Sequence, residues 1–170
     1  MRRTLLLLPL AVACGDKDAS DDSTPPEAFA PAEGHWSVIA QTVPLDECGF
    51  FTPDAEDTAQ EVYGFTLTLF NEATFYVLGD EEGAERLLCT LDDHDFSCES
   101  SARSDLIGGG QATLTVTESP AGTFVDERHV NVQVGLEATC EGSGCAAAEA
   151  QLGITFPCSA RIENSSEVDG

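Results

Sequence analysis

Apolar and polar residues alternate in short runs along most of the chain. In segment 130–138 every second residue is apolar, and segments 63–69 and 112–116 show the same period of two. This period predicts β-strands that bury one face and expose the other. Only segment 145–152, CAAAEAQL, has the composition of a helix, with Ser143 as a candidate cap before it.

Neighbouring runs of this kind predict hairpins. Segments 63–69 and 74–78 form one expected hairpin and segments 86–91 and 95–100 a second, while Ser-Pro-Ala-Gly at 119–122 predicts a further turn. Eight or nine short strands in succession predict an all-β fold, an antiparallel meander closed as a barrel or folded as a sandwich. The architecture would be similar to that of a lipocalin, although the chain has no lipocalin signature motif.

Polar segments set the expected domain boundaries. Residues 15–33 are rich in Asp, Ser, Pro and Ala, and residues 163–170 are polar without an apolar period. Segments of this composition bury too little apolar surface to fold on their own. We therefore expect one β-domain at 34–162, preceded by a disordered acidic linker and followed by a polar tail.

The N-terminal segment has the composition of an export signal. Arg2 and Arg3 precede an apolar run at 5–13, which is too short to span roughly 30 Å of hydrocarbon as a helix. We therefore expect residues 1–13 to be a signal peptide that is removed.

The end of this segment, Ala11-Val12-Ala13-Cys14, resembles the lipobox of bacterial lipoproteins, in which a Cys after small residues receives a lipid group. The resemblance implies that Cys14 becomes the acylated first residue and anchors the protein to a membrane of the bacterial envelope. Segment 14–33 would then be the tether, and Gly15 would permit sorting to the outer membrane. The alternative is an ordinary signal peptide cleaved before Cys14, which would leave a free thiol in an oxidising compartment.

The other six cysteines predict three disulfides, because the number is even and the compartment oxidising. If the second hairpin turns at Asp93-His94, Leu91 faces Phe96 and Cys89 faces Cys98. The opposed Cα atoms would then lie roughly 4.5 Å apart, which is close enough for a disulfide.

The remaining four cysteines allow two arrangements. Cys140 and Cys158 share the parity of the core face, which favours a Cys140–Cys158 disulfide together with Cys48–Cys145 in the long loop after Pro44. The alternative is Cys140–Cys145 together with Cys48–Cys158.

The charge of the chain excludes the most common anionic partners. Without Arg2 and Arg3, five Lys and Arg face 31 Asp and Glu, so the mature net charge is −26. Such a surface repels nucleic acid and anionic lipids, and we expect neither as a partner. The cysteine spacings contain no C-x-x-C pair, so a zinc site is not expected, and no motif predicts a cofactor.

The densest polar cluster is Asp92-Asp93-His94-Asp95. Carboxylates at a turn can converge on calcium, which makes Asp92, Asp93 and Asp95 the metal-ligand candidates. The spacing differs from that of an EF-hand loop, and turns favour Asp for backbone reasons alone, so we expect solvated charges and no metal here.

The candidates for chemistry or ligand binding are few. His35, His94 and His129 have no Ser or Cys partner that the sequence reveals, although a catalytic triad assembles in space and a hydrolase stays open. The aromatic residues that could line or close the mouth of a barrel and contact a small apolar ligand are Phe50, Phe51, Tyr63 and Phe65.

The first functional hypothesis is a non-catalytic envelope lipoprotein whose β-domain binds a partner, such as an envelope protein, or has a structural role. The alternative is a carrier of a small apolar ligand, which predicts a barrel cavity of several hundred cubic ångströms lined by Tyr63, Phe65 and Val132. A filled core would favour the structural role.

Overall fold

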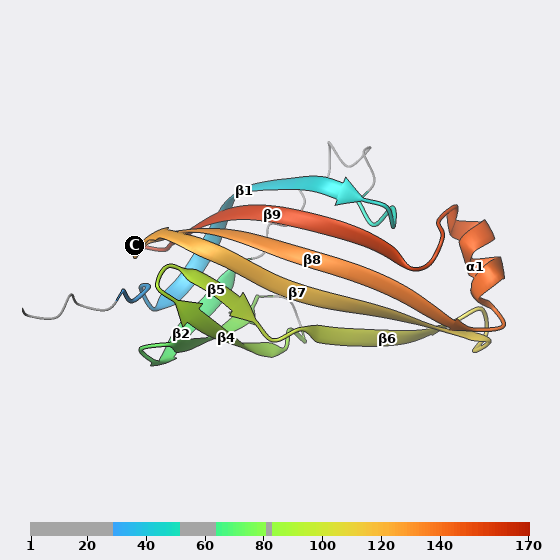
Figure 1. Cartoon of the computed structure of the whole chain (residues 1–170), viewed down its shortest axis with the longest axis horizontal. Helices are drawn as coiled ribbons and strands as arrows, with labels where there is room; N and C mark the ends of the chain where they lie inside the picture. The colour runs from blue at the N-terminus through green and yellow to red at the C-terminus, as the bar shows by residue number, and fades with distance from the viewer. Residues whose placement is uncertain (1–28, 52–63, 81–82) are drawn as a thin grey trace, which may run out of the picture.

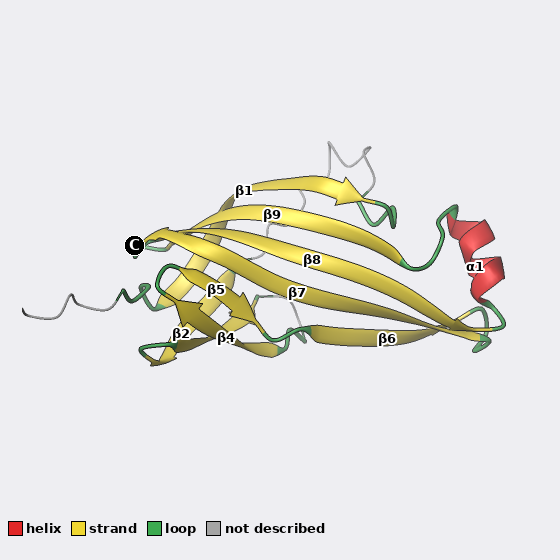
Figure 2. Ribbon diagram, in the orientation of Figure 1, coloured by secondary structure: helices red, strands yellow, loops and turns green. Residues whose placement is uncertain are grey.

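The fold is an antiparallel β-meander that closes into a ring (Figure 1, Figure 2). The computed structural model describes residues 29–51, 64–80 and 83–170, so Cys14 and Tyr63 lie outside the described residues. The elements in these residues are β1 (Gly34–Asp46), β2 (Phe65–Asn71), β3 (Thr74–Gly79), β4 (Arg86–Asp92), β5 (Asp95–Cys98), β6 (Ser101–Ile107), β7 (Ala112–Asp126), β8 (His129–Gly142), α1 (Cys145–Leu152) and β9 (Cys158–Val168).

The ring closes because β7 has two partners on one of its sides. The strand order is β5-β4-β3-β2-β1-β9-β8-β7-β6, and β5 also pairs with residues 121–123 of β7. Residues 112–118 of β7 pair instead with β6. The described chain therefore forms an eight-stranded barrel at one end, and β1 and β6 to β9 continue beyond it as an open sheet on the side of α1 (Figure 1).

The predicted all-β meander is thus confirmed, and of the two expected forms it is the barrel. The helix predicted at 145–152 is present, but the strands are not all short. β1, β7 and β8 have 13, 15 and 14 residues. Gly144 caps the helix without a side-chain hydrogen bond, so Ser143 is not the cap that the sequence indicated.

The core divides in the same way as the sheet. The larger cluster fills the closed barrel around Trp36, which is fully buried, and a smaller one around Ala138 lies on the open part of the sheet. Successive side chains of a strand point to opposite faces, so the alternating apolar side chains point inward, as the sequence predicted. The buried residues of the barrel core are Trp36, Leu67, Phe75, Cys89, Leu91, Phe96, Phe124, Val130 and Val168.

The register of the second hairpin is confirmed. Cys89 pairs with Cys98 and Leu91 with Phe96 across β4 and β5, and the turn lies at Asp93-His94. The two sulfurs form a disulfide with the Cα atoms 3.8 Å apart. Asp93 takes a left-handed conformation with φ of 56°, which Asp tolerates better than most residues.

The predicted disulfides Cys140–Cys158 and Cys48–Cys145 are wrong, and the structure has Cys48–Cys158 and Cys140–Cys145 instead. Cys158 lies opposite Ala138, so Cys140 is its diagonal neighbour. Diagonal Cα atoms in a sheet are about 7–8 Å apart, beyond the range of a disulfide. Cys140 and Cys158 therefore lie on the same face of the sheet, but too far apart for their sulfurs to bond.

Cys48 reaches Cys158 because β1 runs along β9. Leu45 pairs with Arg161 and Asp46 with Ala160. The next residue, Glu47, donates its backbone N–H to the Ser159 carbonyl at 2.9 Å. Continuing this register places Cys48 opposite Cys158. The sequence indicated a loop after Pro44, but the strand continues through this proline with register shifts between Val38 and Ala40 and between Thr42 and Leu45.

Both expected domain boundaries are wrong by several residues. The segment 163–170 is not a polar tail, because β9 continues to Val168, and Ser166 and Val168 are buried. Residues 29–33 are not part of a disordered linker, because they pack on the barrel. Ala32 donates its N–H to the Glu127 carbonyl at 2.8 Å, and Trp36 Nε1 donates to the Ala32 carbonyl at 3.2 Å.

The turn predicted at 119–122 is instead the middle of β7. Pro120 lies between the part of β7 that pairs with β6 and the part that pairs with β5, so its missing N–H falls where that side has no neighbouring strand. At Gly122 the Phe96 ring occupies the space of a side chain, since an added Cβ would lie 2.7 Å from the ring. Proline and glycine here mark a change of partner strand.

Candidate functional site

The barrel encloses a small, mainly apolar cavity of about 170 Å3. Three Phe rings on its wall, Phe75, Phe96 and Phe124, pack edge to face or tilted with centroids 5.2 to 5.8 Å apart. A fourth, Phe65, stacks against Trp36 at 6.0 Å. Aromatic rings in this arrangement offer both faces and edges to a bound ring.

Two polar side chains on β9 face this apolar space. Asn164 and Ser166 line the cavity, and Asn164 Oδ1 and Ser166 Oγ are buried without a hydrogen-bond partner in the described residues. Ser166 is only 1% exposed. Its neighbours on the adjacent strands are Val38 and Val130, which offer no side-chain partner. An unpaired buried polar group costs about 1–3 kcal/mol, so these two atoms weaken the folded state.

Charged residues mark the side on which the cavity reaches solvent. Glu85, just before β4, and Arg103 on β6 line the cavity and are exposed, and half-buried Glu118 on β7 lines it beside them. The opening therefore carries two carboxylates and one guanidinium.

A second polar cluster joins the start of β1 to the end of the chain. His35 Nδ1 lies 2.6 Å from Asp169 Oδ2, and His35 Nε2 lies 2.7 Å from Asp80 Oδ2. Carboxylates only accept hydrogen bonds, so both contacts are made when both ring nitrogens carry a proton. The pKa of His35 is raised above 6.5 by the hydrogen bond to Asp80 and then by that to Asp169.

Asp169 also accepts a hydrogen bond from Ser37 Oγ at 2.7 Å. This bond, followed by the one from His35, lowers the pKa of the Asp169 carboxyl. The serine hydroxyl therefore contacts the carboxylate and not the imidazole, so the cluster lacks the base–nucleophile hydrogen bond of a catalytic triad.

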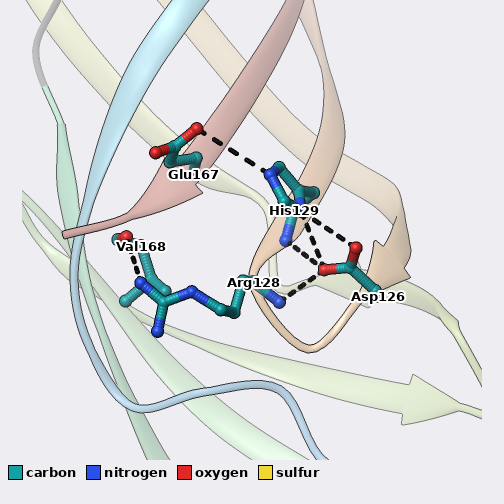
Figure 3. Close-up of polar contacts among 5 residues, drawn as sticks. All are labelled: Asp126, Arg128, His129, Glu167 and Val168. Atoms are coloured by element: carbon teal, nitrogen blue, oxygen red, sulfur yellow. Dashed lines mark hydrogen bonds and ion pairs between the residues drawn. The ribbon is translucent and has the colours of Figure 1, made fainter. Parts of the chain in front are cut away.

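A third cluster closes the turn between β7 and β8 (Figure 3). Asp126 accepts hydrogen bonds from the backbone N–H groups of Arg128 and His129 and from the His129 ring, all between 2.7 and 2.9 Å. The backbone bond from Arg128 is the main cause of the lowered pKa of Asp126, followed by the His129 side chain. Figure 3 shows Glu167 on the opposite side of the His129 ring, 3.8 Å from Nε2.

The same turn is bonded to the end of β9. Arg128 Nη2 donates to the Val168 carbonyl at 3.1 Å, and Val168 donates its N–H to the Arg128 carbonyl at 3.1 Å. These contacts hold the turn and the C-terminal strand together. In the described residues no Ser or Cys is hydrogen-bonded to a histidine ring.

The acidic hairpin tip has the geometry of a turn. Asp92 and Asp95 are an opposed pair, Asp95 accepts a hydrogen bond from Thr123 at 2.6 Å, and Asp93 lies 3.1 Å from His94 Nδ1. The described residues contain no group of three His, Cys, Asp or Glu side chains arranged to hold a metal ion.

Tyr63 lies outside the described residues, and of the other three aromatic residues expected at a ligand site the structure places only Phe65 at the cavity. Phe50 and Phe51 contact each other and donate their backbone N–H groups to Asp46, and neither lines the cavity. They follow Cys48, which lies just after β1 and packs in the smaller cluster with Ala138 and Cys158, so the structure does not place them at the barrel cavity. Val132 lines the cavity as expected.

Sequence reasoning missed Asn164 and Ser166. Both lie on the core parity of β9, two and four residues after Ile162. Polar residues at the core-facing positions of a strand can be recognised in a sequence. These two were overlooked because the domain was expected to end at Ile162.

Compared with known proteins, the chain matches no protein-family model, no curated protein and no solved structure. Within the described ranges, no helix has the length and apolar character needed to cross a membrane.

Proposed function

We propose that this chain is a non-catalytic lipoprotein of the bacterial envelope, anchored through Cys14, whose barrel carries a small apolar ligand. The observation that supports ligand binding is the apolar cavity with the two unpaired polar atoms of Asn164 and Ser166. A ligand site is typically an apolar concavity with a few polar groups that fix orientation. The volume of about 170 Å3 is smaller than the several hundred cubic ångströms that the sequence predicted for a carrier, so the proposed ligand is smaller than expected.

The anchor is supported by the lipobox resemblance at Cys14 and by the cysteine count. The six other cysteines are paired in three disulfides, which makes Cys14 the odd one in an oxidising compartment. The histidine clusters support a non-catalytic role, because the rings of His35 and His129 contact carboxylates that tie strands and turns together.

Ligand binding is tested by thermal unfolding of the purified domain with and without toluene. At a toluene concentration ten times its Kd, binding adds roughly 1.4 kcal/mol and raises the Tm by about 4 °C. Val132→Phe places a ring in the cavity and removes this shift. The matched control is Val125→Phe, because Val125 is 62% exposed and lies outside the cavity lining.

Native mass spectrometry of the protein purified from its own host provides the second measurement. A retained small molecule is the expected result. No retained molecule and no toluene shift in the wild type would refute the carrier function and favour a structural role for the domain.

A further inference from the structure

The polar atoms inside the cavity define the chemistry of the ligand more closely. We infer that the ligand is a neutral single-ring molecule with a hydroxyl group, such as a phenol, and that Asn164 and Ser166 determine its specificity. This inference rests on the proposed carrier function and assigns the ligand class of the same cavity.

The size of the cavity selects a single ring. An engineered protein cavity of about 150 Å3 binds benzene, whereas sites for larger organic ligands occupy about 300–1,000 Å3. The barrel cavity of about 170 Å3 therefore accommodates one ring with one or two substituents and excludes a long acyl chain.

The wall favours an aromatic ring. Phe75, Phe96 and Phe124 form a cluster in which each ring contacts the other two. Edge-to-face and offset aromatic pairs are more favourable than their buried area alone accounts for. An aromatic ligand would extend this cluster by one ring.

The two orphan oxygens select a hydroxyl group. Asn164 and Ser166 point to the same face of β9, and residues two apart on a strand are separated by about 6.7 Å, so one group between them can contact both. A hydroxyl donates and accepts, which satisfies Ser166 Oγ and either orientation of the Asn164 amide. No other side chain in the described residues bonds these atoms.

The electrostatics exclude an anionic ligand. Two of the three charged residues that line the opening, Glu85 and Glu118, are carboxylates, and the whole chain has a net charge of −24. A carboxylate ligand would be repelled and would lose its hydration in an apolar space. A phenol is neutral at pH 7 and meets neither penalty.

The test compares phenol with toluene, which have the same ring and nearly the same size, by isothermal titration calorimetry. The wild type is expected to bind both. Ser166→Ala is expected to weaken phenol binding about two- to tenfold, the equivalent of one lost hydrogen bond, and to leave toluene binding unchanged or tighter. Ser165→Ala is the matched control, because Ser165 bonds Asn131 on the outer face, and it should alter neither affinity.

Asn164→Leu gives a second, independent variant with the same expected contrast between the two ligands. Thermal unfolding without ligand checks the fold, and Ser166→Ala should raise the Tm because it removes an unpaired buried hydroxyl. If both ligands bind but neither variant lowers phenol affinity relative to toluene, the inferred ligand class is wrong and the carrier function stands. If neither ligand binds the wild type, the carrier function itself fails.

Discussion

The Cys48–Cys158 disulfide should stabilise the fold more than either of the others. It closes a loop with a sequence separation of 110 residues, whereas Cys140–Cys145 and Cys89–Cys98 span 5 and 9. In the chain-entropy description, a cross-link stabilises the native state by restricting the unfolded chain, and the effect grows with the logarithm of the loop length. The perturbation is the double substitution of Cys48 and Cys158 by Ala, with the double substitution of Cys140 and Cys145 as the matched control.

The expected magnitudes follow from these separations. The entropy relation gives about 4.8 kcal/mol for Cys48–Cys158 and about 2.1 kcal/mol for Cys140–Cys145. Cys48 and Cys158 are also buried, 4% and 3% exposed, in the cluster around Ala138, so their loss removes packing as well. The first double variant should therefore be less stable than the second by about 2.7 kcal/mol or slightly more.

Urea unfolding followed by tryptophan fluorescence measures this difference. Trp36 is the only tryptophan of the chain and is fully buried, so its emission reports unfolding of the barrel. The difference corresponds to a midpoint lower by roughly 1–2 M urea. Equal midpoints for the two double variants, or a lower midpoint for the Cys140–Cys145 variant, would refute the reasoning from loop length.

Two further predictions concern the termini. The pKa of His35 is raised, so its contacts with Asp80 and Asp169 stabilise the fold fully below about pH 6.5, and this contribution is lost as the pH rises through the raised pKa. His35→Gln should therefore lower the Tm more near pH 6 than near pH 9. Equal losses of Tm at the two pH values would contradict the ionic contribution. Cys14→Ser should move the protein from the detergent phase to the aqueous phase of a detergent extraction, whereas a wild type found only in the aqueous phase would exclude the anchor.

The features predicted correctly from sequence are local ones. The register of β4 and β5 depends on the turn at Asp93-His94 and on residues within five positions of it, so alternation alone places Cys89 opposite Cys98. The same holds for the hairpin of β2 and β3 and for the short helix, whose residues are neighbours in the sequence.

The features that could not be predicted depend on pairs of strands far apart in the chain. The pairing of β1 with β9 joins the two ends of the described fold, and it alone brings Cys48 to Cys158. The closure of the ring by β5 on β7 likewise turns Pro120 and Gly122 from apparent turn residues into the middle of a strand. Local pattern contains no information about which distant edge a strand will find.

The polar residues inside the barrel connect the fold to the proposed function. At the position beside Ser166, β1 and β8 supply Val38 and Val130, so a valine or alanine on β9 would continue the apolar wall. Asn164 and Ser166 instead leave two buried atoms unpaired, which together cost roughly 2–6 kcal/mol. That is a large fraction of the 5–15 kcal/mol by which a typical domain is stable. Local violations of packing rules are expected where binding requires them, and a ligand hydroxyl between these side chains would recover the lost hydrogen bonds.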